Sequence, residues 1–428
     1  MTTRLQWLSL QIVRRLWFRA TAFSVMAVVT ALLAAFVTPY IPADIPAKIG
    51  SDAVDALLGI IAASMLSVTI FSLSTLVSAY ASATSHATPR ATRLLSEDNT
   101  AQNALATFVG SFLFSLVGII ALQTGLYGER GRVVLYVVTL VVIALIVATL
   151  LRWIDHVSKL GRVGETTQRV EKAAARALRH RHQRPYLGGQ PLTDPRSRPD
   201  DALAICADRY GYVAHIDMSA LHEIAGDGPA RIFVDALPGS YVDTSRALAW
   251  LDGRHTPEAV AAVREAFTVG EVRSFDQDPR FGAAVLAEIA SHALSPSLND
   301  AGTAIDVLGR ATRLLAIWAE PPPQDAGDIR YPRIHVPPIL LADLFDDVFT
   351  PIARDGAGSV EVGIRLQKML RVLAGLGPNY RAAARHHSTL ALARAEAALS
   401  LEDDRRRVRE AADQVQAEPL GPTRAGLS

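Results

Sequence analysis

The stretch ALLGIIAASMLSVTIFSLSTLVSAYASATS, residues 56–85, decides the fold class because it contains no charged residue. A helix needs roughly 20 apolar residues to cross a bilayer, so a helix of this length can span one. Three further apolar stretches approach or reach that length, at about residues 16–37, 104–127 and 133–151. The sequence therefore predicts a four-span transmembrane domain within residues 1–151.

Charge divides the 428-residue chain into two unlike parts. The chain carries 43 Lys+Arg and 42 Asp+Glu, a net charge of +1. Residues 1–151 contain only 15 of these side chains, whereas residues 152–428 contain the other 70, a density ordinary for a soluble domain. This distribution excludes a single soluble domain and a disordered chain. The lone cysteine, Cys206, excludes an internal disulfide and a cysteine-rich zinc site.

Basic residues flanking the spans predict the orientation, because loops rich in Lys and Arg stay in the cytoplasm. Basic side chains precede the first span, separate the second from the third and follow the fourth. The first outer loop instead carries three acids and one lysine. We therefore expect a multi-pass protein with both its N- and C-termini in the cytoplasm.

The second span is unusually rich in hydroxyl side chains, and five serines share one helical face by their spacing. These serines are Ser67, Ser74, Ser78, Ser82 and Ser85. One interpretation is a hydroxylated wall along a water-filled path. The other is a small-residue surface that lets two helices approach closely, which the spacing suits equally well. Apart from Arg19 in the first turn of the first span, no Asp, Glu, Lys, Arg or His lies inside the spans, which disfavours proton-coupled pumping.

Residues 152–200 are predicted to form a basic juxtamembrane helix followed by a linker rich in Pro and Gly. Residues 152–184 have a net charge of +6, which would attract anionic lipid headgroups. The cations nearest the membrane are Arg152, Lys159, Arg162 and Arg169. The segment lacks interleaved aromatic residues, so we do not expect nucleic acid as a partner.

The remainder predicts a cytoplasmic α+β domain in two parts and a tail. Residues 201–270 alternate as short strands, and their order looks like the small barrel-sandwich fold. No lysine lies between positions 172 and 368, so a lysine-linked swinging arm is excluded. Residues 271–415 read as mainly helical, with an edge strand at GEVRSF and the last three helices over Leu340–Ile352, Val360–Leu376 and Tyr380–Val415. Residues 416–428 are expected to be disordered.

The segment RSFDQDPRFG, residues 273–282, opens the most distinctive part of the second half. Asp278 and Pro279 predict a helix start, and the later SPSLND predicts a turn with a second helix to about Ala319. Polar caps at this hairpin suggest an anion or ligand site. The candidate ligand-binding residues are Arg273, Asp276, Asp278, Asn299 and Asp300. The alternative is structural: Asn299 and Asp300 serve as caps, and Arg273 pairs with Asp276 or Asp278.

The phrases QDPRFG and ALSPSLNDAGTA, together with FSLSTLVSAYASATSHATPRATRLL and four spans, resemble a family of bacterial predicted membrane proteins. That family is known as domain of unknown function 2254, and the resemblance covers roughly residues 10–400. It implies a location in the bacterial inner membrane and a shared soluble domain. It implies no activity.

The sequence contains no pattern that predicts catalysis. It has no Gly-rich phosphate loop, no G-x-S-x-G and no H-E-x-x-H, so we expect no catalytic residues, no metal and no cofactor. The leading hypothesis is an oligomeric channel or transport protein, a homo-oligomer with a cytoplasmic regulatory domain. The alternative is a membrane-anchored scaffold or sensor whose cytoplasmic domain binds a ligand or partner. A hydrolytic enzyme is a remote third hypothesis.

Overall fold

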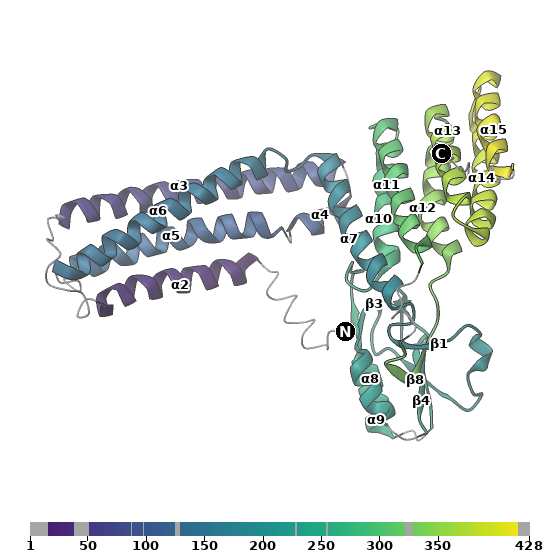
Figure 1. Cartoon of the computed structure of the whole chain (residues 1–428), viewed down its shortest axis with the longest axis horizontal. Helices are drawn as coiled ribbons and strands as arrows, with labels where there is room; N and C mark the ends of the chain where they lie inside the picture. The colour runs from purple at the N-terminus through teal and green to yellow at the C-terminus, as the bar shows by residue number, and fades with distance from the viewer. Residues whose placement is uncertain are drawn as a thin grey trace, which may run out of the picture. The chain divides into compact units, whose positions relative to one another are not determined.

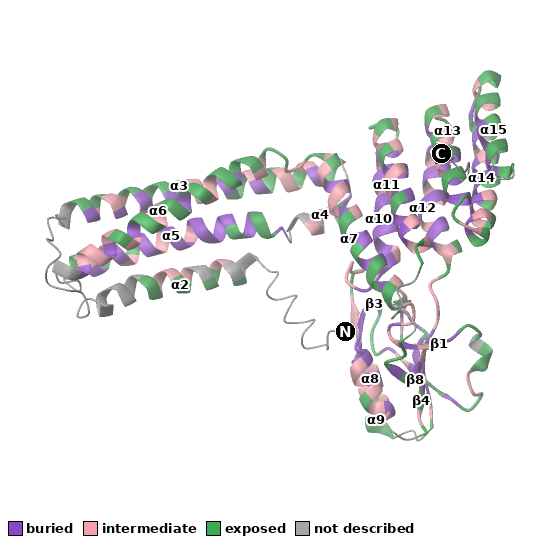
Figure 2. Ribbon diagram, in the orientation of Figure 1, coloured by how far each residue is buried: buried purple, intermediate pink, exposed green. Residues whose placement is uncertain are grey.

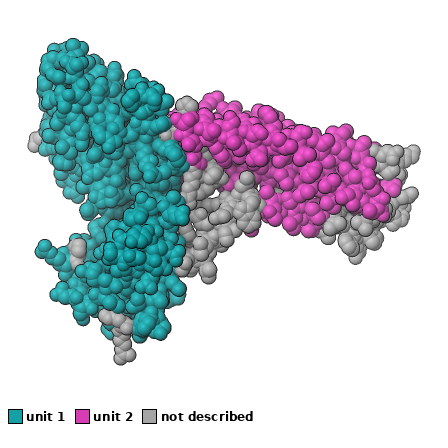
Figure 3. All heavy atoms as spheres, turned by 180° about the vertical axis from the view of Figure 1, so that it is seen from behind, with its two compact units in different colours: residues 1–7, 86–91, 167–428 teal, residues 8–85, 92–166 magenta. Residues whose placement is uncertain are grey.

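The computed structural model describes residues 16–37, 51–86, 88–96, 98–124, 129–226, 229–253, 256–321 and 328–417. The chain forms two compact units, coloured separately in Figure 3. We call residues 8–85 and 92–166 the membrane unit, and residues 1–7, 86–91 and 167–428 the α/β unit. The basic leader before Leu16 and the predicted tail beyond residue 417 lie outside the described residues.

The membrane unit is built from long apolar helices (Figure 1). They are α2 (Leu16–Val37), α3 (Ser51–His86), α5 (Asn99–Gln123) and α6 (Glu129–Val157), with the short α4 (Pro89–Ser96) between α3 and α5. Within the described residues, three of them are long and apolar enough to cross a membrane, namely α3, α5 and α6. Within the described residues, α2 contributes the apolar segment Ala20–Thr30, which is shorter than a span. The predicted count of four spans is therefore not confirmed.

Large apolar side chains hold α3, α5 and α6 together. One core cluster brings Met65 and Leu76 of α3 against Phe108 of α5 and Trp153 of α6. Asp98 caps the start of α5, and its carboxylate accepts hydrogen bonds from the amides of Thr100 and Ala101. Each helix thus buries one face against its neighbours and leaves much of the remainder exposed, as Figure 2 shows along α3 and α6.

The α/β unit contains two small sheets. The strands are β1 (Gly189–Pro191), β2 (Leu203–Cys206), β3 (Gly211–Ile216), β4 (Arg231–Val234), β5 (Tyr241–Val242), β6 (Ala247–Asp252), β7 (Phe267–Gly270) and β8 (Tyr331–Val336). The five-stranded sheet has the order β1-β8-β4-β6-β2, and the three-stranded sheet has the order β5-β3-β7. β8 pairs in parallel with both β1 and β4, whereas the other pairs are antiparallel.

This topology does not confirm the predicted barrel-sandwich arrangement of residues 201–270. The strand β8 comes from beyond α11 (Ala301–Ala319) and enters the middle of the larger sheet. The edge strand β1 comes from the stretch that the sequence predicts as a linker. Local alternation of residues predicts strands but not their partners, which here lie more than 100 residues apart. The α/β unit is therefore a mixed sheet region with helices.

Two short helices, α8 (Met218–Ala225) and α9 (Pro257–Ala266), pack against the strands. Their residues Leu221 and Val263 are fully buried in one cluster with Val213, Ile232 and Leu248 of the strands. Asp217 and Thr256 cap the two helices by accepting hydrogen bonds from backbone amides. The cluster forms the core of the sheet region.

The helical part packs as a layer of α10 (Pro279–Ala293), α11 (Ala301–Ala319), α12 (Leu341–Asp355), α13 (Val360–Ala374), α14 (Pro378–Ala398) and α15 (Glu402–Gln416). The predicted start of α10 after the Asp278 cap and the predicted end of α11 at Ala319 are confirmed. The prediction of one helix from Tyr380 to Val415 is wrong, because Leu399–Leu401 separates α14 from α15. Arg405 donates to the carbonyl of Leu399 there, and three acids begin α15, which favours a new helix start.

One smaller prediction also needs correction. The residues GEVRSF do not form an edge strand, since β7 ends at Gly270. The helix α7 (Val163–Gln183) follows α6 as predicted, and one of its faces is buried. A Cβ atom on Gly282 of α10 would lie 2.3 Å from the Cβ of Ala174, so α7 and α10 are in close contact. Glu171 of α7 also pairs with Arg310 and Arg313 of α11.

Candidate functional site

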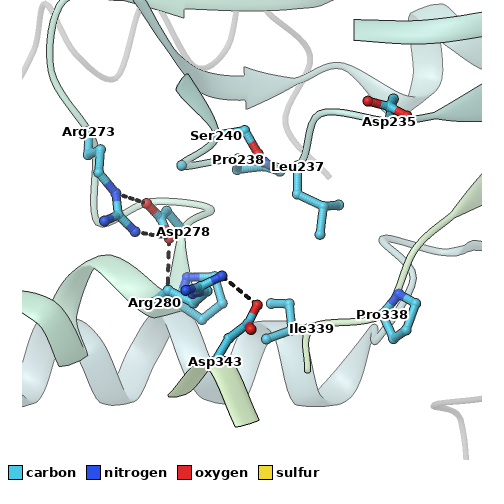
Figure 4. A pocket seen from close by; sticks show the side chains of 12 residues that line it. Asp235, Leu237, Pro238, Ser240, Arg273, Asp278, Arg280, Pro338, Ile339 and Asp343 are labelled. Carbon is cyan, nitrogen blue, oxygen red and sulfur yellow. Dashed lines mark hydrogen bonds and ion pairs between the residues drawn. The ribbon is translucent and has the colours of Figure 1, made fainter. Parts of the chain in front are cut away.

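A cavity of about 250 Å³ opens in the α/β unit where four segments meet (Figure 4). Its wall is formed by the turn between β4 and β5, the segment after β7, the start of α10, and the loop that leads from β8 into α12. The charged side chains in the wall are Asp235, Arg273, Asp278, Arg280 and Asp343. Three of these belong to the segment that the sequence singles out.

Asp278 lies at the centre of this wall. Its carboxylate accepts two hydrogen bonds from Arg273, at 2.7 and 3.1 Å, and two from the amides of Arg280 and Phe281. The side chain is only 3% exposed. Burial raises the pKa of Asp278, and the bonds from Arg273 and the amides oppose that rise. The residue is thus both the cap of α10 and one half of a buried ion pair.

Arg280 joins the start of α10 to α12. Its Nε and Nη2 donate to Asp347 at 2.7 and 3.0 Å, and its Nη1 donates to Asp343 at 2.6 Å. The hydrogen bond with Asp347 is the main cause of a raised Arg280 pKa. All three guanidinium nitrogens therefore bind carboxylates, and the contact with Asp347 is bidentate.

Gly239 brings the β4–β5 turn against Asp278. It adopts a φ of 96°, in the region that favours glycine. A Cβ atom at this position would lie 2.2 Å from Oδ2 of Asp278. Its amide donates to the carbonyl of Val213, which ties the turn to β3. The close approach of turn and carboxylate thus depends on glycine for two independent reasons.

Arg181, near the end of α7, interacts electrostatically with Asp278. The side chain is almost fully buried, with Nε and Nη2 unpaired among the described residues and a long 3.5 Å bond from Nη1 to the carbonyl of Pro185. Burial lowers the pKa of Arg181 to about 10, and the charge of Asp278 opposes that shift. Asp278 therefore interacts with two arginines, Arg273 by hydrogen bonds and Arg181 through space.

The five predicted ligand-binding residues do not form one cluster. Arg273 and Asp278 form an ion pair at the cavity, and Asp276 lies between them in sequence but not in the cavity wall. Asn299 and Asp300 are exposed beyond the other end of α10, about 20 Å away for a helix of its length. Asp300 caps α11 through the amide and hydroxyl of Thr303, and Asn299 has a φ of 47°.

Sequence reasoning missed Asp235, Gly239 and Asp343, which reach the cavity from other segments. Arg280 stands inside the QDPRFG phrase and could have been found there. The dipeptide Pro238-Gly239 was a visible signal for a turn, but nothing local indicates that it meets Asp278.

The serine face of α3 is turned away from the helix core. Ser67, Ser74, Ser78 and Ser85 are exposed, and Ser82 is half-buried. At 100° per residue the four exposed serines fall within about 40° of one another, and buried Met65 and Leu76 lie on the opposite side. The hydroxyl of Ser67 donates to the carbonyl of Ala63, which reduces the cost of an apolar environment.

The predicted membrane-surface cations occupy the end of α6 and the start of α7. Arg152 and Arg162 are exposed, Arg169 is half-buried, and Lys159 pairs with Asp155 at 2.8 Å. Across the described ranges, no group of three or more His, Cys, Asp or Glu side chains is placed to hold a metal ion.

Comparison with known proteins gives a family without an assigned activity. A sequence model of the family described as "Predicted membrane protein (DUF2254)" matches residues 13–372. Uncharacterized proteins of Mycobacterium bovis and Mycobacterium tuberculosis are each 26% identical over 261 residues, which is 58% of this chain and 49% of each relative. The match thus spans about half the length of these curated relatives. No solved structure matches the chain.

Proposed function

The chain belongs to the DUF2254 family of predicted membrane proteins, and from that premise we propose that it is an oligomeric channel or transport protein. It works in the bacterial inner membrane as a four-span homo-oligomer, with the α/β unit as its cytoplasmic regulatory domain. The proposal assigns it no enzymatic reaction and no cofactor.

The exposed serine face of α3 is the observation that supports this proposal. A helix that only anchors the protein needs no hydroxyl side chains on its outer face, and lipid tails offer these hydroxyls no partner beyond the carbonyls of their own helix. In a homo-oligomer, the faces of several α3 helices would meet. They would line a shared path or pack closely through small residues, and both arrangements place the serines between subunits.

Connectivity supports the proposed orientation. Residues 86–91, between α3 and α5, belong to the same compact unit as residues 167–428. Within that unit Arg90 forms an ion pair with Glu288 of α10. The connection between α3 and α5 and the chain after α6 would then lie on one side of the membrane. Arg152 and Arg162 on that side would bind anionic headgroups, at about 1 kcal/mol per cation.

Flux through purified protein in liposomes tests the proposal. We expect ion or solute flux above that of empty liposomes, and a loss of flux in Ser74→Leu and Ser78→Leu, because leucine would fill and dehydrate the shared face. Leu73→Ile is the matched control, since Leu73 is exposed on the flank of α3. Flux equal to that of empty liposomes would refute transport.

A ligand-binding sensor is the second candidate, and the cavity beside Asp278 is the observation that favours it. Its wall contains the start of α10 and loops that leave both sheets. A bound ligand could therefore change how these elements pack against one another. A sensor without transport would show ligand-dependent thermal stability and no flux from the same preparation.

A further inference from the structure

We infer that the cavity beside Asp278 binds a small neutral polyhydroxy compound, a cyclic polyol or sugar, whose hydroxyl groups bond to both sides of the wall. This inference names a ligand class for the sensor candidate and does not depend on transport activity. It rests on the unused hydrogen-bond donors and acceptors of the wall, on where they lie, and on the balance of charges around them.

The wall holds hydrogen-bond donors that the described structure leaves unused. The backbone amides of Leu237 and Ile339 and the hydroxyl of Ser240 donate to no acceptor among the described residues. The guanidinium of Arg280 uses three of its five N–H groups. A ligand with oxygen acceptors can therefore gain hydrogen bonds from several parts of the wall.

The same wall holds unused acceptors. Asp235 is exposed, and in the described structure its carboxylate forms no hydrogen bond or ion pair. Asp343 accepts from Arg280 through Oδ2, and no group among the described residues donates to its other carboxylate oxygen. A hydroxyl group on a ligand both donates and accepts, so it can bond to either kind of wall group.

The unused groups lie on two sides of the cavity. Figure 4 shows Asp235, Leu237 and Ser240 on one side, and Arg280, Asp343 and Ile339 on the other. A ligand with a single polar head would leave one side without a partner, whereas a ring with hydroxyl groups around its edge reaches both. The cavity of about 250 Å³ lies just below the range of roughly 300–1,000 Å³ typical of small-molecule sites, which suits a single ring.

The charges around the cavity favour a neutral ligand. Three guanidinium groups and three carboxylates balance one another, namely those of Arg181, Arg273, Arg280, Asp278, Asp343 and Asp347. The remaining charge, on Asp235, is exposed to water and needs no ionic partner. An anion would meet the carboxylates of Asp235, Asp278 and Asp343 in the wall, and their repulsion opposes its binding.

Titration of the full-length protein in lipid nanodiscs, followed by saturation-transfer NMR, tests this site. The probes share a six-membered ring: myo-inositol, cyclohexanol and cyclohexylammonium, with empty nanodiscs as the background for lipid binding. We expect myo-inositol to bind about tenfold more tightly than either of the others, because only it offers hydroxyl groups to both sides. Binding of cyclohexanol as tight as that of myo-inositol would overturn the role of several hydroxyls. Binding of cyclohexylammonium as tight as that would overturn the preference for a neutral ligand.

The variants Asp235→Ala and Ser240→Ala isolate the proposed contacts. We expect Asp235→Ala to weaken myo-inositol binding by about tenfold and Ser240→Ala by about threefold. Thermal stability should not change, because neither side chain bonds to another described residue. Asp201→Ala is the matched control, since Asp201 is exposed in the same unit and lies outside the cavity.

Undiminished binding by either variant, or no binding of myo-inositol by the unmodified protein, would overturn the inference. Neither result would alter the flux measurement that tests transport. The sensor candidate has its own test, because a ligand of another class would still raise the thermal stability of the protein.

Discussion

Asp278 and Asp300 lie at two ends of the same helical hairpin, and each caps a helix by the same chemistry. Asp278 precedes α10 and Asp300 precedes α11. Burial raises the pKa of Asp278, whereas hydrogen bonds from Thr303 lower the pKa of the exposed Asp300. The capping interaction is therefore alike at both ends, and only the surroundings make the Asp278 end a candidate site.

The two caps differ most in the charges that depend on them. Asp278 neutralises Arg273 and lies close to the buried Arg181, while Asp300 bonds the amide and hydroxyl of Thr303. A buried charge left without its partner costs several kcal/mol, but an exposed cap contributes about 1 kcal/mol. Substitutions at the two positions should therefore differ in how much stability they remove, as well as in their effect on the cavity.

Asp278→Ala should have the largest effect on stability. It removes the α10 cap and leaves Arg273 and Arg181 without their carboxylate, at a cost of roughly 3–5 kcal/mol. The measurement is thermal unfolding of the purified protein, with Asp276→Ala as control because Asp276 lies outside the cavity wall. A loss no greater than that of the control would mean that the buried pair contributes nothing.

Gly239→Ala should come second. The substitution forces a Cβ atom against Asp278 and places alanine at a positive φ, with a cost of roughly 2–3 kcal/mol. Gly377→Ala is the matched control, because Gly377 also has a positive φ, 146°, but a Cβ atom there would meet nothing within 4 Å. Equal unfolding temperatures for the two variants would show that the turn yields easily and that the contact with Asp278 is not tight.

The sequence predicts the hairpin well because its signals are local. Asp278 and Pro279 mark the start of α10, and SPSLND marks the turn, so caps and breaks follow from neighbouring residues. The cavity could not be predicted in this way. Asp343 meets Arg280 across 63 positions of sequence, and β8 enters the larger sheet from beyond α11. Such pairings depend on the whole fold.

The serine face of α3 is a similar case in the membrane unit. Its spacing predicts that the serines share a side of the helix, and the structure shows that this side is opposite the core. What covers that side depends on a further subunit or on lipid, which helical periodicity does not specify.

Asp300 should give the smallest effect, and its pH dependence sharpens the contrast with Asp278. The pKa of Asp300 is lowered from 3.8 by folding, so its ionisation stabilises the protein above about pH 4 and that stability is lost as the pH falls through the folded pKa. Asp300→Asn keeps the cap but cannot ionise, so its unfolding temperature should approach that of the unmodified protein as the pH falls from about 6 to about 3.

Asp278 should behave in the opposite sense over the same acid range. Because folding raises its pKa, the folded state holds the proton more readily, and its contribution to stability falls as the pH rises through the folded pKa. Asp278→Asn should therefore lose least stability, relative to the unmodified protein, at pH values above the folded pKa of Asp278, where the buried carboxylate is ionised. The stability of each asparagine variant is compared with that of the unmodified protein at each pH. If both differences change in the same direction with pH, burial does not raise the pKa of Asp278 in the folded protein.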